Sequence, residues 1–182
     1  MVITMDIYLF EKYDTTSKLK NILYQDYNII NCEIIKNRYG KKFLENNEIY
    51  FNISHTNNIL SFVFDCEECG IDIEYTQKQR RVEQLANHYF TNEEKEVVLN
   101  SDNIKNSFYH IWTMKESYSK MIGSGIVGYF NNIPSNYYES IKSYKILIDN
   151  ELYILSISCK NIKDKEINFK IDLNKKVIVE EI

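Results

Sequence analysis

The order of strand-like and helix-like segments is the feature that most restricts the fold of this 182-residue chain. Strand-like segments, in which apolar and polar residues often alternate, recur through the first 75 residues and return after about residue 141. Apolar residues at helical spacing dominate between roughly residues 80 and 122. Strands and helices grouped in blocks do not follow the alternation of parallel α/β proteins. The sequence therefore predicts an α+β fold with antiparallel sheet.

The expected elements follow from these periodicities. Asn57 and Asn58 suit a tight hairpin turn, and Gly40 marks an earlier turn. We expect helices at residues 15–27, 80–89, 92–100 and 103–122. We expect strands at residues 2–10, 32–36, 49–56, 59–66, 69–75, 143–149, 152–159 and 167–172.

A weak internal similarity bears on the domain organisation. The segment NNILSFVF at residues 57–64 resembles NELYILSIS at residues 150–158, and both follow a turn. The alternative is that sheet strands in general share such a pattern. A duplication would make residues 1–182 a single unit of two similar lobes, approximately 1–69 and 70–182. Each lobe would be an antiparallel sheet packed with helix.

Charge and hydropathy exclude several classes of protein. The formal net charge of −4 is spread over both signs, whereas a nucleic-acid-binding protein would show a basic face. No run of about 20 apolar residues exists, so we expect no membrane span. The N-terminal segment MVITMDIYLF lacks a basic region and does not resemble a secretory signal. We expect a cytoplasmic protein.

The four cysteines favour the same location. Cys66 and Cys69 form a lone C-x-x-C pair, whereas a structural zinc site needs four ligands. We therefore expect ordinary reduced thiols.

Two carboxylates stand two residues apart in the segment GIDIE. Asp72 and Glu74 would point to the same face of a strand, while Ile71 and Ile73 would point into the core. Neighbouring carboxylates raise each other's cost of ionisation, and a hard divalent cation relieves that cost. A solvated strand edge is the alternative interpretation.

The expected helix at residues 103–122 adds a third carboxylate. Glu116 and Lys120 follow Trp112 at steps of four residues, away from the helix's apolar stripe. Alone, such a pair is a common feature of helix surfaces, worth about 0.3–0.5 kcal/mol. Lys115 borders the apolar stripe. That stripe consists of Ile111, Met114, Tyr118 and Met121.

Other polar residues also have ordinary structural explanations. His55 lies in Ser54-His55-Thr56 near the end of a strand, and Lys41 follows Gly40 in a turn. Glu94 completes a capping box with Thr91. Together, however, three carboxylates, three lysines and a histidine suggest a hard-cation site surrounded by phosphate-binding groups.

The wording and order of these motifs resemble the Sfp-type 4'-phosphopantetheinyl transferases. The motifs span residues 39 to 120, and the combination of GIDIE with WTMKES is the specific part. The matching pieces are YGKK, FNISHT, GIDIE, YFTNEE and WTMKESYSK.

The resemblance implies an activity and a fold. Members of this family move the phosphopantetheine arm of coenzyme A to a serine of an apo acyl or peptidyl carrier protein and release 3',5'-ADP. Their two similar α+β lobes hold the active site between them, so we expect an active monomer. Alternatives are a relative that binds coenzyme A or a carrier protein without turnover, and a magnesium-dependent phosphohydrolase or nuclease.

The resemblance also implies the carboxylate roles. By motif position, Asp72, Glu74 and Glu116 would bind Mg²⁺. Glu94 aligns with a glutamate near the metal. The sequence leaves open whether a metal-bound hydroxide or a carboxylate such as Glu94 removes the proton of the carrier serine.

The basic residues would hold coenzyme A. Lys120 would bind its phosphates, with Lys115 beside it. His55, with Ser54, would hold phosphate, and Lys41 matches the lysine of the family's usual YGKP motif.

Overall fold

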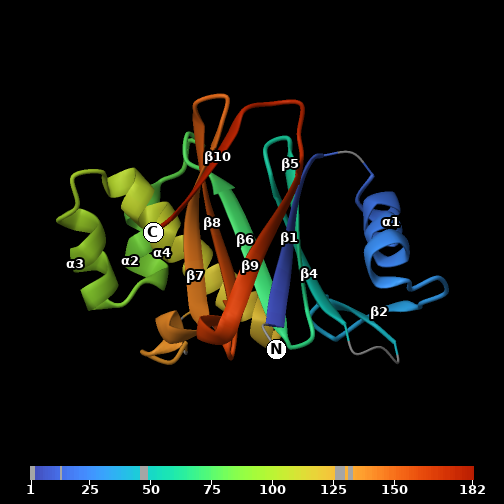
Figure 1. The fold of residues 1–182 in the computed structure, drawn as a ribbon. Helices are drawn as coiled ribbons and strands as arrows, with labels where there is room; N and C mark the ends of the chain where they lie inside the picture. The colour runs from blue at the N-terminus through green and yellow to red at the C-terminus, as the bar shows by residue number, and fades with distance from the viewer. Residues whose placement is uncertain (1–2, 13, 46–48, 126–129, 131–132) are drawn as a thin grey trace.

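The structure is a computed structural model that describes residues 3–12, 14–45, 49–125, 130 and 133–182. Two β-sheets lie face to face at its centre, with α1 on one side and α2, α3 and α4 on the other (Figure 1). The helices are α1 (Thr15–Tyr27), α2 (Val82–Tyr89), α3 (Asn92–Leu99) and α4 (Ile104–Ile122). The strands are β1 (Ile3–Glu11), β2 (Ile34–Lys36), β3 (Lys42–Leu44), β4 (Tyr50–Thr56), β5 (Ile59–Asp65), β6 (Cys69–Tyr75), β7 (Ile141–Ile148), β8 (Glu151–Cys159), β9 (Lys165–Asp172) and β10 (Val177–Glu181).

The strands form two four-stranded sheets and a small hairpin of β2 and β3. The first sheet has the order β4-β5-β1-β9 and the second the order β10-β7-β8-β6. The strands β5 and β8, whose sequences resemble each other, both occupy interior positions. One pair departs from the predicted antiparallel pattern, because β1 and β9 are parallel, with Ile3 opposite Lys165 and Phe10 opposite Asp172.

Alternating side chains divide the interior into layers. On β1, Met5, Ile7 and Leu9 are buried between the two sheets, whereas Tyr8 and Phe10 face the other way. Because successive side chains of a strand point to opposite faces, one strand contributes to both cores. On the outer face of the first sheet, α1 packs with three buried apolar residues, Leu19, Ile22 and Leu23.

The helix α4 lies directly on the second sheet. Gly70 allows this approach, because an added Cβ would come within 2.5 Å of the backbone nitrogen of Met121 and still closer to the carbonyl oxygen of Ser117. The helix is buried on more than its predicted apolar face, since Trp112, Lys115 and Glu116 are each at most 8% exposed.

Most sequence predictions of the fold are confirmed. The α+β class is correct, each large sheet packs against helix, and the helix of residues 15–27 has the predicted bounds. The strands β3 and β10 were not predicted, and the pair β1–β9 is parallel where antiparallel sheet was expected. The strand predicted from residue 2 is described from Ile3 onward, and residue 2 lies outside the described residues.

The lobe bounds at residues 69 and 70 stay a prediction, and β9 shows that the chain returns to the first sheet after completing most of the second. The cysteines Cys32, Cys66, Cys69 and Cys159 are free. Among the helices of the described residues, none has both the length and the hydropathy of a membrane span.

Candidate active site

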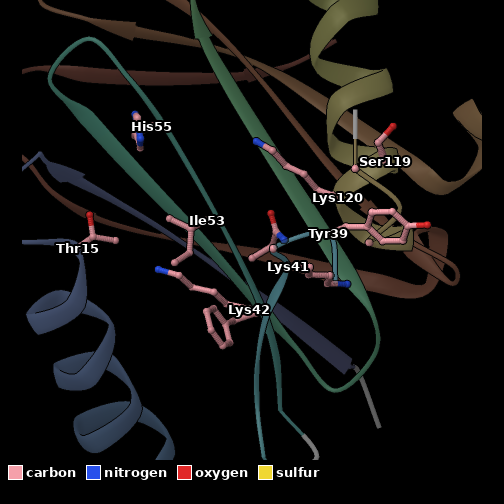
Figure 2. A pocket seen from close by; sticks show the side chains of 13 residues that line it. Thr15, Tyr39, Lys41, Lys42, Ile53, His55, Ser119 and Lys120 are labelled. Carbon is pink, nitrogen blue, oxygen red and sulfur yellow. The ribbon is translucent and has the colours of Figure 1, made fainter. Parts of the chain in front are cut away.

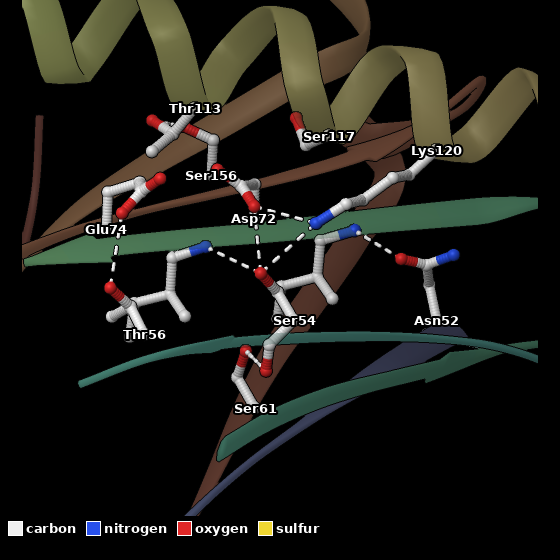
Figure 3. Close-up of polar contacts among 12 residues, drawn as sticks. Asn52, Ser54, Thr56, Ser61, Asp72, Glu74, Thr113, Ser117, Lys120 and Ser156 are labelled. Atoms are coloured by element: carbon white, nitrogen blue, oxygen red, sulfur yellow. Dashed lines mark hydrogen bonds and ion pairs between the residues drawn. The ribbon is translucent and has the colours of Figure 1, made fainter. Parts of the chain in front are cut away.

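The candidate site lies where edge strands of the two sheets meet. The strands β4 and β6 run side by side, and three polar side chains of β4 face β6 (Figure 3). We call this contact the β4–β6 seam. Its members are Asn52, Ser54 and Thr56 of β4, and Ile71, Ile73 and Tyr75 of β6.

Asp72 points from β6 away from the core, as its alternation with Ile71 and Ile73 predicts. Its Oδ1 accepts hydrogen bonds from Ser54 Oγ at 2.8 Å and from Lys120 Nζ at 2.7 Å. Its Oδ2 is buried and has no hydrogen-bond partner within the described residues. Burial raises the pKa of Asp72, and the charge of Lys120 opposes that shift. The carboxylate therefore keeps one oxygen available for a further ligand.

Glu74 lies on the same face and is held by two cations. Lys78 Nζ lies 2.6 Å from Glu74 Oε2, and Arg80 Nη2 lies 2.7 Å from Glu74 Oε1. Thr56 Oγ1 also donates to Oε2 at 3.1 Å. The Arg80 guanidinium lies 5.6 Å from the ring centre of Trp112, which places it between helix α4 and strand β6. Because these contacts use both oxygens of Glu74, the negative charge at this end of the site is compensated by the protein.

Glu116 enters from helix α4 and is 6% exposed. Burial, followed by the charge of Asp72, raises the pKa of Glu116 to about 8. Since Glu74 also contributes to this shift, the three carboxylates interact electrostatically. That Asp72, Glu74 and Glu116 together hold a metal ion stays a prediction.

The donor set suits a hard cation. All three groups are carboxylates, which Mg²⁺ and Ca²⁺ prefer, and the buried Oδ2 of Asp72 has a free lone pair. As the side chains stand, no group of three or more His, Cys, Asp or Glu residues in the described part of the chain is arranged to hold a metal ion. Lys120 and Arg80 instead provide the positive charge beside Asp72 and Glu74.

A pocket of about 480 Å³ reaches Lys120, and its lining residues do not include Asp72, Glu74 or Glu116. Four of its lining residues are basic or carry an imidazole, and they come from the β2–β3 hairpin, from β4 and from α4 (Figure 2). These four residues are Lys41, Lys42, His55 and Lys120. Such a wall fits a polyanionic ligand, since phosphate oxygens accept charge-assisted hydrogen bonds. Lys120 connects the pocket to the carboxylates because its Nζ contacts Asp72.

The imidazole ring of His55 lies close to a further lysine, Lys12. Lys12 Nζ lies 3.4 Å from His55 Nδ1. Partial loss of solvent around the ring, followed by the charge of Lys12, lowers the pKa of His55. An anion bound here would compensate the charge of Lys12 and favour protonation of His55.

Lys41 ties the pocket wall to helix α4. Its Nζ donates to the carbonyl oxygen of Met121 at 2.6 Å and pairs with Glu68. The carbonyl group belongs to the last turn of α4, so Lys41 stabilises the helix end that carries Lys120.

Lys115 and Glu94 form a separate cluster. Lys115 is 1% exposed, and its Nζ lies 2.8 Å from Glu94 Oε2. Tyr137 donates to the other oxygen of Glu94 at 3.0 Å, and the predicted capping box with Thr91 is present. The rings of Phe90, Phe130 and Tyr137 surround the ammonium group at 5.7–5.9 Å. The structure therefore does not bring these two predicted site residues to the pocket wall.

The sequence analysis missed several residues of the site. Lys78 and Arg80 belong to the basic run KQRR, which begins three residues after the end of GIDIEY, and that position close to two carboxylates was a usable signal. Asn52 and Thr56 were also missed. Their signal is the alternation N-x-S-x-T in the strand segment YFNISHT, since buried polar side chains need partners. Lys12 had no local signal, because its partner is 43 residues away.

Comparison with known proteins identifies the class to which this arrangement is similar. A sequence model of the 4'-phosphopantetheinyl transferase superfamily matches residues 68–152, which include Asp72, Glu74, Glu116 and Lys120. The resemblance to Sfp-type transferases is therefore confirmed over this part of the chain.

Individual relatives agree with the match. The 4'-phosphopantetheinyl transferase Sfp of Bacillus subtilis is 35% identical over 91 residues, which are 48% of this chain and 40% of that protein. The transferase gsp of Aneurinibacillus migulanus is 34% identical over 113 residues, covering 59% and 46%. The transferase HetI of Nostoc is 36% identical over 90 residues, covering 48% and 38%. The aligned part thus spans less than half the length of each of these relatives.

Proposed function

We propose that this protein transfers the 4'-phosphopantetheine arm of coenzyme A to a serine of an apo acyl or peptidyl carrier protein. The observation that carries the proposal is the position of Lys120, which lines a cationic pocket and contacts Asp72, whose charge raises the pKa of Glu116. One residue thus joins a site for phosphates to a group of carboxylates. The similarity to 4'-phosphopantetheinyl transferases over this region supports the same reaction.

In this proposal the basic pocket holds coenzyme A. Lys41, His55 and Lys120 would face its phosphates, and the hydroxyl of Ser54 keeps Lys120 in place through a 3.1 Å hydrogen bond. The carrier serine would attack the phosphorus that bears the pantetheine group. The bond from that phosphorus to 3',5'-ADP would break, and the serine would lose its proton.

Asp72, Glu74 and Glu116 would hold Mg²⁺. When bound, the metal would offset the charge of the phosphates at the reacting phosphorus. Asp72 and Glu116 are both buried, so a nearby cation would stabilise the charged form of each carboxylate. Lys78 and Arg80 would hold the Glu74 carboxylate in place through their ion pairs with its two oxygens.

Three further features belong to the proposal. The partner is a carrier protein, and nucleic acid is not a partner. The protein acts as a monomer, because a single chain already supplies the walls of the pocket, from the β2–β3 hairpin, β4 and α4. It works in the cytoplasm, where free cysteines stay reduced.

The test is transfer itself. The protein is incubated with coenzyme A, Mg²⁺ and several apo-carrier proteins, and each carrier is weighed by mass spectrometry. A carrier that gains one phosphopantetheine group supports the proposal. Coenzyme A binding without any mass gain would instead identify a binding relative without turnover.

Matched variants connect the reaction to the site. Asp72→Asn and Glu116→Gln should each abolish transfer while the fold is retained, as measured by circular dichroism. Glu96→Gln is the control, because it removes an exposed carboxylate of α3 outside the pocket. Turnover near the wild-type rate in Asp72→Asn or Glu116→Gln would contradict the proposed roles.

A further inference from the structure

The β4–β6 seam joins two sheets through side chains at regular spacing. The Oδ1 of Asn52 accepts from the Ile71 N–H at 3.4 Å. Two residues further along each strand, Ser54 Oγ accepts from the Ile73 N–H at 3.3 Å. The next step repeats the contact, because Thr56 Oγ1 accepts from the Tyr75 N–H at 3.3 Å. Side chains on β4 thus satisfy alternate N–H groups of the edge strand β6.

Each seam hydroxyl also reaches a carboxylate. A hydroxyl has a single hydrogen to donate. Since Thr56 Oγ1 accepts from Tyr75, its hydrogen is free for Glu74 Oε2, which lies 3.1 Å away. Ser54 acts in the same way, accepting from Ile73 and donating to Asp72 Oδ1 at 2.8 Å. One hydroxyl therefore connects an N–H of β6 to the carboxylate of the preceding residue.

We propose that Thr56 is a positioning residue that fixes the direction of the Glu74 carboxylate toward a divalent cation, as Ser54 fixes Asp72. The role of the cation rests on the proposed function. The geometry of the seam stands independently of it. Thr56 is 2% exposed, so its hydroxyl has no competing solvent contact. Groups that orient metal ligands change metal affinity or activity by about 10–100-fold when they are removed.

A purely structural role makes a different prediction. If Thr56 served only to satisfy the N–H of Tyr75, its loss would loosen β6 without changing cation affinity. The structural role and the positioning role can be distinguished because the Thr56 hydroxyl bonds to two groups, the N–H of Tyr75 and the carboxylate of Glu74. The backbone partner is observed by amide exchange and the carboxylate partner by metal binding.

The experiment compares Thr56→Val, which removes the hydroxyl at nearly constant volume, with Thr56→Ser, which keeps it. Mn²⁺ affinity is measured by electron paramagnetic resonance, exchange of the Tyr75 amide by NMR, and transfer by carrier mass. Thr76→Val is the matched control, because Thr76 is also buried and donates to a backbone carbonyl, that of Leu152.

We expect Thr56→Val to lower Mn²⁺ affinity about 10–100-fold and to accelerate exchange of the Tyr75 amide. Thr56→Ser should restore both properties, and Thr76→Val should keep the wild-type affinity. Wild-type affinity in Thr56→Val, even with faster exchange, would overturn the inference. So would a Thr56→Ser protein as weak as Thr56→Val, or a wild-type protein whose Mn²⁺ binding does not require Asp72.

The two proposals fail in different ways. A protein with Mn²⁺ binding that depends on Thr56 but with no transfer to any carrier contradicts the proposed function and supports the inference. A protein that transfers normally with Thr56→Val contradicts the inference alone.

Discussion

The ammonium group of Lys165 lies 2.7 Å from Oδ1 of Asp65, and neither side chain has any exposed surface. Asp65 ends β5 and Lys165 begins β9, so the ion pair connects two segments 100 residues apart. The backbone N–H of Glu67 also donates to Asp65 Oδ1. A buried charge of this kind is tolerated only while its partner is present.

Removing Lys165 should therefore destabilise the protein strongly. We expect Lys165→Met to lower the free energy of unfolding by about 3–5 kcal/mol, because the buried carboxyl group of Asp65 would lose its cationic partner. The double variant Lys165→Met/Asp65→Asn should be more stable than Lys165→Met alone. Urea denaturation of the wild type, the two single variants and the double variant gives the coupling energy. A double variant less stable than both single variants would contradict this prediction.

Gly70 should tolerate no side chain. An alanine Cβ at this position would meet the backbone of α4, so we expect Gly70→Ala to cost at least the roughly 1–3 kcal/mol of an overpacked core. The chain has one tryptophan, Trp112, which lies on α4, the helix that an alanine at position 70 would displace. Its fluorescence should therefore change.

Gly40→Ala is the control for Gly70→Ala. Gly40 has a φ of +89°, so alanine is strained there, but its Cβ would have nothing within 4 Å. We expect a loss of stability without a change in Trp112 emission. Unchanged emission and unchanged stability in Gly70→Ala would show that α4 does not lie against β6 as described.

His110 should make stability depend on pH. Burial, followed by the charge of Lys145, lowers the pKa of His110 in the folded protein. The unfolded chain would bind a proton near its ordinary pKa of about 6.5, whereas the folded protein resists protonation. Stability should therefore fall as the pH decreases below about 6.5, until the folded pKa is reached.

The measurement is urea denaturation of wild type and His110→Gln between neutral and mildly acidic pH. The wild type should lose more stability over this window than the variant. Parallel curves for the two proteins would mean that His110 does not contribute to the pH dependence.

Lys12 should contribute to the binding of coenzyme A. It lies beside His55 at the predicted phosphate site. A charge-assisted hydrogen bond is worth roughly 1.5–3 kcal/mol, which corresponds to about tenfold or more in affinity. We expect Lys12→Met to raise the KM for coenzyme A by that factor. The effect should be smaller for dephospho-coenzyme A if the pair holds the 3'-phosphate.

Lys20→Met serves as the comparison for Lys12→Met, because Lys20 is an exposed lysine of α1. A KM for coenzyme A that is equal in the Lys12→Met variant and in wild type would exclude a role for Lys12.

Local patterns in the sequence were sufficient for most of the elements and for the paired carboxylates. Asp72 and Glu74 share a face because strand periodicity is two, and Ile71 and Ile73 are in the core as predicted. The strand β10 was missed because it is short and lies beside charged residues in NKKVIVEE. The parallel pairing of β1 with β9 depends on contacts about 162 residues apart, which periodicity cannot reveal.

The surroundings of Lys115 show a second limit. Its position on α4 gives only its direction around the helix axis. Its ionic partner, Glu94, lies 21 residues earlier on another helix. Burial on several faces of α4 could not be read from the helix alone, because neighbouring elements decide which faces are covered.

The pairing of β9 with β1 has a consequence for synthesis on the ribosome. The first sheet contains residues from both ends of the described chain, so it cannot be completed until residues 165–172 have emerged. Until β9 emerges, one edge of β1 stays unpaired. Exposed strand edges favour pairing with other chains. Long-range pairing of this kind also slows folding. Truncation before β9 should therefore yield a nascent product that aggregates, even though it retains every carboxylate of the candidate site.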